Sequence, residues 1–494
     1  MSTVAPKQAL FGACTCSLLG WRRYARGSGR TAGLQVQGGA VKCAPGLAHF
    51  VEGEGDAKRP GLDLDSGRVS TLLASLPALT SMSLGVHADL DSRPTAAAVR
   101  ASLAEAARAI GRCSSLQQLC LHSILLAGEL DQLPEALARE LARAHTLEEV
   151  DLWFQVPDFY LPQDWPATFS LAHLVAGLAG LSRLRALSLQ VDRLRMEAVL
   201  PASVSCLAQL TSLMLSGFDG LRCAPGWARL PALARLAFEY CAFAGGGEAA
   251  LPGMDSLVVL TSLSVLECAG LRALPTSLWR LSQLCSIVHR PNTWALAGVP
   301  CSELPVASLP LSGAPCCASL SCLSLPGHNL PVFPPGILTA RRLTHLDLTL
   351  SCFEQLPEGV SALTALEELH LGRHAAGGGL GVGGTLDARA LGSLAGFPNL
   401  CSLSFARCSL LLCPSFQAAA AHPRLTRLAL CISYPARGPS CGAFLGFVIS
   451  LLQQERLGVL ELSCSDVEGA GRQDSRRFRA ALEAVGFPLR DEVD

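Results

Sequence analysis

Leucines recur along the chain in short blocks of the form L-x-x-L-x-L, as at 343–348 and again at 366–371. The last two leucines of a block are separated by one residue. In an extended segment both therefore point to one face, and the residue between them points to the other. Fourteen blocks, strict or with substitutions, predict fourteen short strands. The blocks end at Leu84, Leu121, Leu152, Leu189, Leu215, Phe238, Val265, His289, Leu325, Leu348, Leu371, Phe405, Leu430 and Leu462.

The spacing of these blocks predicts how the strands connect. Successive ends are 23 to 37 residues apart, and parallel strands need a crossover of about a dozen residues or more to return to register. A second pattern, L-P-x-x-L-x-x-L-x-x-L, precedes several blocks; it begins at Leu200, Leu274 and Leu356, and more loosely at Phe333. Because one repeat cannot bury its leucines alone, we expect stacked repeats with one continuous core.

These two patterns resemble the leucine-rich-repeat family, and the copies of about 23 residues that contain L-P resemble its plant-type intracellular subclass. The resemblance implies an α/β fold: a curved solenoid of irregular repeats with a parallel β-sheet on its concave face. The family favours Asn or Cys three positions after each strand. This chain has Cys241, Cys268, Asn292 and Cys408 there, and His328, Ser351, His374 and Ser433 as replacements.

The chain divides into three predicted parts: an N-terminal segment at 1–64 that is partly disordered or a targeting signal, about fourteen repeats at 65–465, and a C-terminal capping helix and tail at 466–494. Longer spacings in the N-terminal half predict amphipathic helices on the convex side. These helices are expected at 95–110, 133–144 and 166–178, the capping helix at 474–485, and Gly/Pro-rich insertions at 300–316 and 375–384.

Composition narrows the function classes. A 50% hydrophobic content excludes global disorder, and a formal charge of −1 gives no overall basic field for nucleic acid. We expect no membrane span, because no charge-free apolar run approaches ~20 residues. The 21 cysteines lack the clusters that cap secreted repeat arrays, which favours a reducing compartment. We expect a cytoplasmic location. An organelle, addressed by the acid-free segment before Glu52, and the ciliary axoneme are alternatives.

Candidate chemistry is sparse. Lysine occurs only at 7, 42 and 58, so the body of the chain lacks a P-loop or Schiff-base lysine. The G-x-G-x-x-G at 379–384 has no adjoining helix pattern, which favours an insertion. His370 and His374 stand four apart on a predicted strand and its loop, where that spacing does not indicate a metal site. We predict no catalytic, cofactor-binding or metal-binding residues.

The residues between paired apolar positions should face the concavity, and most are small and neutral. An unusual stretch at 151–165 holds five of the 27 aromatics and several acids, a composition typical of interface anchors. Alternatively, this long loop folds its aromatics onto the convex side. Trp153, immediately after a strand, is the preferred single anchor. The candidate protein-binding residues are Asp151, Trp153, Phe154, Glu239, Tyr240, Glu267, Asp347, His370, Arg373 and Arg407.

The sequence therefore predicts a monomeric, non-catalytic module that binds a protein partner of unknown identity on its concave face. Two alternatives stay open. One is an enzyme or enzyme-regulating module in the irregular N-terminal half, which a deep polar cleft with converging ionisable groups near 85–165 would favour. The other is an adaptor or scaffold in ubiquitin-ligase or axonemal assemblies, although 1–64 lacks the apolar helical pattern of an F-box.

Overall fold

The fold is seen in a computed structural model of the 494-residue chain. The structure describes the core of the repeat region and leaves out several connections between repeats. The described residues are 34–36, 80–86, 107–108, 110–124, 133–155, 171–192, 197–271, 273–291, 311, 313–328, 330, 332–351, 356–373, 396–409, 422–433 and 459–465.

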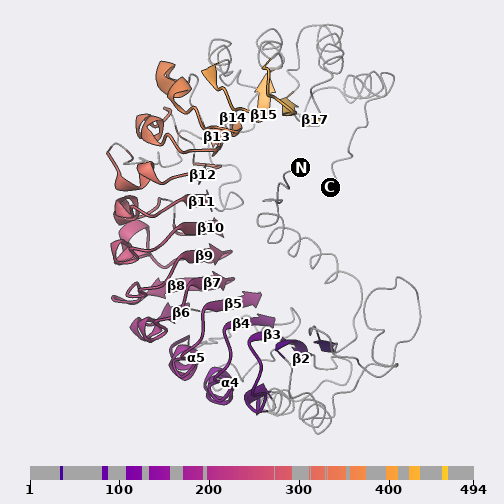
Figure 1. The fold of residues 1–494 in the computed structure, drawn as a ribbon, viewed down its shortest axis with the longest axis vertical. Helices are drawn as coiled ribbons and strands as arrows, with labels where there is room; N and C mark the ends of the chain where they lie inside the picture. The colour runs from indigo at the N-terminus through magenta and orange to yellow at the C-terminus, as the bar shows by residue number, and fades with distance from the viewer. Residues whose placement is uncertain are drawn as a thin grey trace, which may run out of the picture.

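A single sheet of 15 strands runs through the molecule and curves into an arc (Figure 1). Its first strand, β1, pairs antiparallel with β2, and every later pairing in the sheet is parallel. In sheet order the strands are β1 (Leu34–Val36), β2 (Ser81–Val86), β3 (Gln118–Ile124), β4 (Glu149–Gln155), β5 (Ala186–Asp192), β7 (Ser212–Ser216), β9 (Arg235–Glu239), β10 (Ser262–Cys268), β11 (Ser286–Pro291), β12 (Cys322–Ser324), β13 (His345–Ser351), β14 (Glu368–Arg373), β15 (Ser402–Ser409), β16 (Arg427–Ser433) and β17 (Val459–Ser465).

The strand register confirms the repeat pattern. Leu348 pairs with Leu371, which pairs with Phe405 on the next strand, and these are successive predicted block ends. All of the predicted ends lie on the fourteen strands from β2 to β17, except Leu325, which directly follows β12. The chain is an α/β leucine-rich-repeat solenoid. Its core is a stack of leucines behind the sheet, most of them under 5% exposed.

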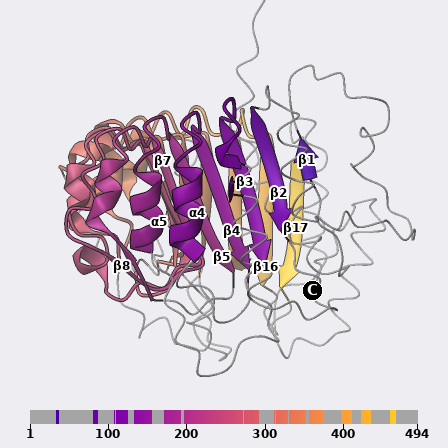
Figure 2. The same ribbon diagram turned by 90° about the horizontal axis from the view of Figure 1, so that it is seen from below.

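The convex side changes character along the chain (Figure 2). Behind the N-terminal strands lie α4 (Leu133–Leu141) and α5 (Leu171–Leu178), which confirm the helix expected at 133–144, with an earlier end, and the described part, 171–178, of the helix expected at 166–178. Of the helix expected at 95–110, the described residues 107, 108 and 110 are helical. The capping helix at 474–485, the insertion at 375–384 and most of that at 300–316 lie outside the described residues.

In the described connections between β6 and β14, short 3-10 helices take the place of α-helices, and the L-P pattern explains where four of them begin. In four repeats a proline with extended ψ is the residue directly before the helix. The fixed φ of proline suits the start of a helix. The apolar residue three positions beyond Pro201, Pro275, Pro334 or Pro357 is then buried. These helices are Ala202–Cys206, Thr276–Arg280, Pro335–Thr339 and Glu358–Ala362.

A second, two-stranded parallel sheet was not predicted. It pairs β6 (Glu197–Leu200) with β8 (Asp219–Cys223) beside the main sheet. The chain enters β8 through Gly217, whose φ is 81° and where a Cβ would lie 1.6 Å from the carbonyl oxygen of Val191. Only glycine fits that backbone and that approach.

Hydrogen bonds tie each repeat to the one before it. Threonines just before the strands donate Oγ1 to backbone carbonyls of the preceding repeat, as Thr146 does to Leu116 at 2.7 Å and Thr344 to Ser321 at 3.0 Å. Cys241, one of the cysteines three positions after a leucine block, is buried and donates its thiol to the carbonyl of Leu215 at 3.5 Å. Among the described residues, no helix is long and apolar enough to cross a membrane.

Candidate functional site

The concave face carries a hollow at the N-terminal end of the sheet. Its volume is about 440 Å³, and it opens toward the concavity. The side chains that alternate with the core leucines form its floor. Two lining residues are acidic and none is basic, so the hollow has a negative lining. The lining residues come from β2, β3, β4, β5 and β7: Ser81, Met82, Gln118, Leu119, Cys120, Glu149, Val150, Asp151, Ala186, Leu187, Ser188, Ser212 and Met214.

Asp151 is held in place at the centre of β4. Its carboxylate accepts a hydrogen bond from Nε2 of Gln190 at 3.2 Å and a weak one from the Cys120 thiol at 3.8 Å. Both donors lie on neighbouring strands, since Asp151 pairs with Cys120 on one side and with Ser188 on the other. Because these donors are uncharged, the carboxylate has no cationic partner among these contacts.

Trp153 lies two residues beyond Asp151 on the same face. Its indole stacks on the imidazole of His122, with ring centroids 4.1 Å apart and planes 13° from parallel. His122 and Trp153 are register partners on β3 and β4, so the stack follows directly from strand pairing. Both rings are half-buried. The stack therefore presents a flat aromatic surface next to the acidic hollow.

Within the aromatic stretch at 151–165, the structure describes the residues up to Gln155. Trp153 faces the concavity, whereas Phe154 points the opposite way, is 1% exposed and packs in the core. Strand alternation forces this split. Phe154 is therefore corrected from an interface candidate to a core residue. The aromatics at 159, 160 and 165 lie outside the described residues.

Strand register separates three further candidates. It aligns Glu239 with Ser216, and that column leads back through Gln190 to Trp153. Tyr240 and Glu267 lie one position later, since Glu239 pairs with Leu266 on the next strand. Both have left-handed backbones, with φ of 51° and 53°. Tyr240 is 50% exposed, whereas Glu239 is buried, and this burial raises the pKa of its carboxyl.

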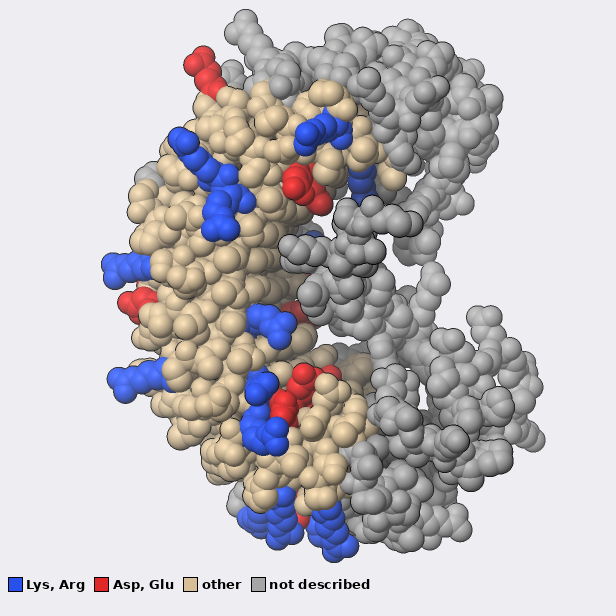
Figure 3. Space-filling model, in the orientation of Figure 1, with Lys and Arg blue, Asp and Glu red and all other residues tan. Residues whose placement is uncertain are grey.

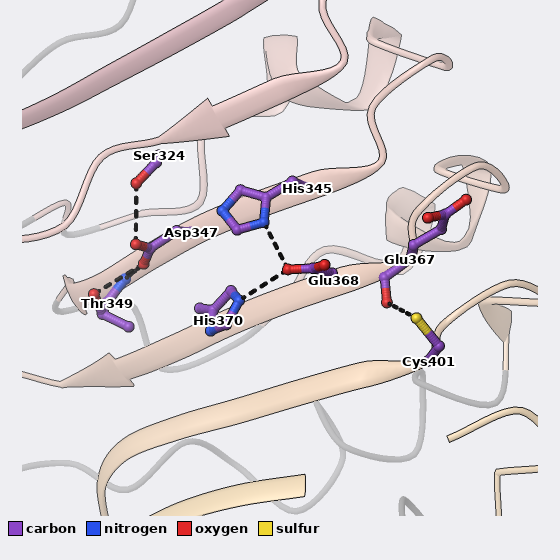
Figure 4. Close-up of polar contacts among 8 residues, drawn as sticks. All are labelled: Ser324, His345, Asp347, Thr349, Glu367, Glu368, His370 and Cys401. Atoms are coloured by element: carbon purple, nitrogen blue, oxygen red, sulfur yellow. Dashed lines mark hydrogen bonds and ion pairs between the residues drawn. The ribbon is translucent and has the colours of Figure 1, made fainter. Parts of the chain in front are cut away.

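The remaining candidates belong to the C-terminal half. Asp347 lies on β13 and accepts hydrogen bonds from the hydroxyls of Ser324, at 3.0 Å, and Thr349, at 2.9 Å (Figure 4). His370 is its register partner on β14. Arg373 ends β14 and Arg407 lies on β15, but their side chains lie outside what the structure describes.

His345 and Glu368 were not among the predicted site residues. Each lies on the concave face, directly before the first leucine of its strand. Oε2 of Glu368 lies 3.1 Å from Nδ1 of His345 and 3.7 Å from Nε2 of His370 (Figure 4). The predicted candidates lie between the paired strand leucines or after them, whereas His345 and Glu368 occupy the position before the first strand leucine. The prediction that the His370–His374 spacing does not indicate a metal site stays a prediction, because His374 lies outside the described residues.

Charge elsewhere is scattered. On the face shown in Figure 3, the described basic and acidic side chains are spread over a largely uncharged surface, with no extended patch of one sign. Besides the hollow, the concave face gathers distinctive chemistry in the cluster of His345, Glu368 and His370.

Comparison with known proteins supplies likeness of fold only. No family model matches the sequence, and no curated protein matches it. A leucine-rich-repeat protein of Leptospira interrogans is 17% identical, with a TM-score of 0.48, over 84% of this chain and 90% of that one. An internalin of Listeria monocytogenes is 11% identical, with a TM-score of 0.36, over 74% and 93%. The ectodomain of the Arabidopsis receptor kinase HAESA, solved with a peptide hormone, is 15% identical, with a TM-score of 0.36, over 73% and 64%.

The chain's own architecture defines its class. Parallel strands in register, leucine-filled coils behind them and buried cysteines bonded to backbone carbonyls give it the leucine-rich-repeat fold. Nothing in these likenesses distinguishes a subclass.

Proposed function

We propose that the chain is a non-catalytic recognition module that binds a protein partner on its concave face, with the hollow on β2–β7 as the principal contact. The acidic, aromatic-edged hollow carries this proposal. Asp151 and Glu149 supply negative charge, and the stacked rings of His122 and Trp153 supply rigid apolar area. Such combinations anchor protein interfaces. The matching partner segment presents a Lys or Arg next to an apolar side chain.

The charge of the hollow argues against a nucleic-acid partner. Phosphate backbones are held by Lys, Arg and backbone N–H groups. The lining residues include two carboxylates and no cation. A phosphate here would meet like charge without compensation, so we propose that the partner is a protein and not a nucleic acid.

The enzyme alternative depended on a deep polar cleft with converging ionisable groups near 85–165. The hollow does overlap that region, but its lining holds two carboxylates, a thiol and three serines without a histidine, lysine or arginine. Catalytic nucleophiles are usually activated by a hydrogen-bonded base. The 3.8 Å contact from the Cys120 thiol to the Asp151 carboxylate is too long for an efficient proton transfer. Recognition is therefore the function that this geometry favours.

Finer assignments complete the proposal. We include membership of the plant-type intracellular subclass, because four repeats carry the L-P pattern followed by 3-10 helices. We also propose that the protein is monomeric and cytoplasmic. Comparing the cellular distribution of the full chain with that of a form lacking residues 1–51 tests the location. A changed distribution would support the organelle alternative.

Variant-resolved affinity capture tests the recognition proposal. The full chain, Trp153→Ala and the control Val258→Ala are each used to capture partners, which are identified by mass spectrometry. Val258 is 62% exposed and lies on the turn before β10, away from the hollow. Loss of an aromatic anchor costs about 2 kcal/mol or more, roughly a 30-fold loss of affinity. We expect a reproducible partner with the full chain and the control, strongly depleted with Trp153→Ala. Equal recovery by all three would refute this role of the hollow.

A further inference from the structure

The C-terminal half of the concave face brings two imidazoles and one carboxylate to a single point. Glu368 and His370 are two residues apart on β14, so both project from the same side of the strand. His345 on β13 is the register partner of Glu368, one strand away. The three donor atoms lie within 4.8 Å of one another. This placement follows from one 23-residue repeat.

The distances match those between ligands of one metal ion. Zn²⁺ binds histidine nitrogen and carboxylate oxygen at about 2.0–2.2 Å, so two ligands of a tetrahedral ion are about 3.3 Å apart. The two observed nitrogen-to-oxygen distances, 3.1 and 3.7 Å, bracket that value. The two imidazole rings have centroids 5.1 Å apart, and their planes are inclined by 45°. Each ring presents one nitrogen to the Glu368 carboxylate.

The surroundings are compatible with a bound cation. The outer register neighbours are uncharged, Cys322 and Ser324 on β12 and Ser402 and Ser404 on β15, and the register partner of His370 on β13 is the acidic Asp347, so no cation opposes a bound ion at these positions. The imidazoles of His345 and His370, whose nearest nitrogens lie 3.1 and 3.7 Å from the carboxylate, hold the pKa of the Glu368 carboxyl well below its usual 4.5, so it is ionised at neutral pH. Burial raises the pKa of the Cys322 thiol, which disfavours a thiolate ligand there.

We propose that His345, Glu368 and His370 form a three-ligand site for a divalent transition metal, with Zn²⁺ as the reference ion. A His₂Glu set leaves a fourth position for water, as in open zinc sites. The side chains are 30%, 48% and 28% exposed, so an ion can enter from the concavity. This site is independent of the hollow, and it departs from the sequence-based expectation of no metal ligands.

Metal titration of the full chain tests the proposal. The chain, kept reduced and freed of metal, is titrated with Zn²⁺ in competition with a chromogenic chelator. The same titration is made on His370→Ala, Glu368→Gln and the control His145→Ala. His145 is exposed between α4 and β4, far from the cluster along the sheet. Circular dichroism verifies that each variant is folded, which is expected because the replaced side chains are partly exposed.

We expect the full chain and His145→Ala to bind one Zn²⁺ equivalent that both cluster variants bind at least about 100-fold more weakly. Loss of outer-shell partners alone costs about 10–100-fold. Because 21 cysteines offer competing thiolates, the experiment is repeated with Co²⁺, whose thiolate complexes show a charge-transfer band that nitrogen and oxygen ligands do not give. The Co²⁺ signal lost in the variants should lack that band. Equal Zn²⁺ binding by full chain and cluster variants, no binding at all, or a variant-sensitive signal with thiolate character would each overturn the site.

Discussion

The hollow on β2–β7 and the cluster on β13–β14 occupy the same concave positions of their repeats yet gather different chemistry. The hollow spreads two carboxylates and small side chains over five strands, with a stacked aromatic pair at its edge. The cluster brings three metal-ligating groups within 4.8 Å on two strands. The first suits a macromolecular surface and the second a single ion. The solenoid supplies the frame, and the side chains at two outward positions per repeat decide the function.

Charge reversal in the hollow should separate the two sites most clearly. Asp151→Arg places a cation where the proposed partner brings one, and such like-charge contacts cost several kcal/mol. We expect partner capture to fall by more than about 100-fold, with Zn²⁺ binding unchanged. The control Asp255→Arg makes the same charge change at an exposed site on the 3-10 helix Met254–Ser256. If both variants capture equally well, the hollow is not the contact; if Asp151→Arg also loses Zn²⁺, the two sites are coupled.

Acid should destabilise the region around the cluster through two buried histidines. His289 and His328 pack edge to face with ring centroids 4.6 Å apart. Burial, with the neighbouring charge of His328, lowers the pKa of His289 to about 3, and burial lowers that of His328 to about 4. Below pH 6.5 the unfolded chain gains protons that the folded chain does not. The contribution of these two histidines to stability is therefore constant above pH 6.5 and decreases as pH falls toward the folded pKa values.

Between pH 6.5 and 5 the expected loss is up to about 2 kcal/mol for each imidazole. Denaturant unfolding at the two pH values measures it, and hydrogen exchange should show the opening at β11–β13 before β4–β7. The double variant His289→Leu/His328→Leu should lose much less stability over the same interval. An identical pH response in the variant would show that other groups carry the acid sensitivity.

The bonds between repeats should contribute equally in both halves. Thr146→Val removes the hydroxyl bond to Leu116 behind the hollow, and Thr344→Val removes its counterpart to Ser321 beside the cluster. Each should lower the free energy of unfolding by about 1 kcal/mol, the usual net value of one hydrogen bond. Denaturant unfolding of each variant measures this value. A cost confined to one half would mean that the repeats are not energetically alike.

The smallest expected effect is the contribution of the Glu368 charge to the free energy of unfolding when no metal is bound. Its folded pKa is below 4.5, so its contribution is present above pH 4.5 and disappears as pH falls below that value. Because the side chain is 48% exposed, Glu368→Gln should cost about 0.5 kcal/mol or less at pH 7. Thermal unfolding in a chelator measures the cost. A loss of several kcal/mol would make the cluster a structural element instead of a binding site.

The sequence predicted the sheet well because leucine alternation encodes both strand position and register. All fourteen block ends fell on or directly after strands of the sheet. It did not predict β1, β6 or β8, which have no leucine block; β8 also depends on the close approach of Gly217 to Val191. Helix ends also shifted, since tertiary packing decides where the chain turns.

The candidate sites were predicted less completely. Asp151 and Trp153 were identified from strand alternation and aromatic content, and the same alternation, applied one residue further, would have placed Phe154 in the core. His345 was missed because its partner Glu368 lies 23 residues away, one full repeat later. Such pairs become visible when the concave positions of successive repeats are aligned in columns.

The meeting of His345 with Glu368 also has an evolutionary consequence. One added coil between β13 and β14 would move these side chains to about 9.6 Å apart while leaving every leucine contact of the stack available. Loss of one coil elsewhere could bring new residues side by side just as simply. Duplication or deletion of a single repeat can therefore create or remove the proposed ion-binding site while the fold stays the same.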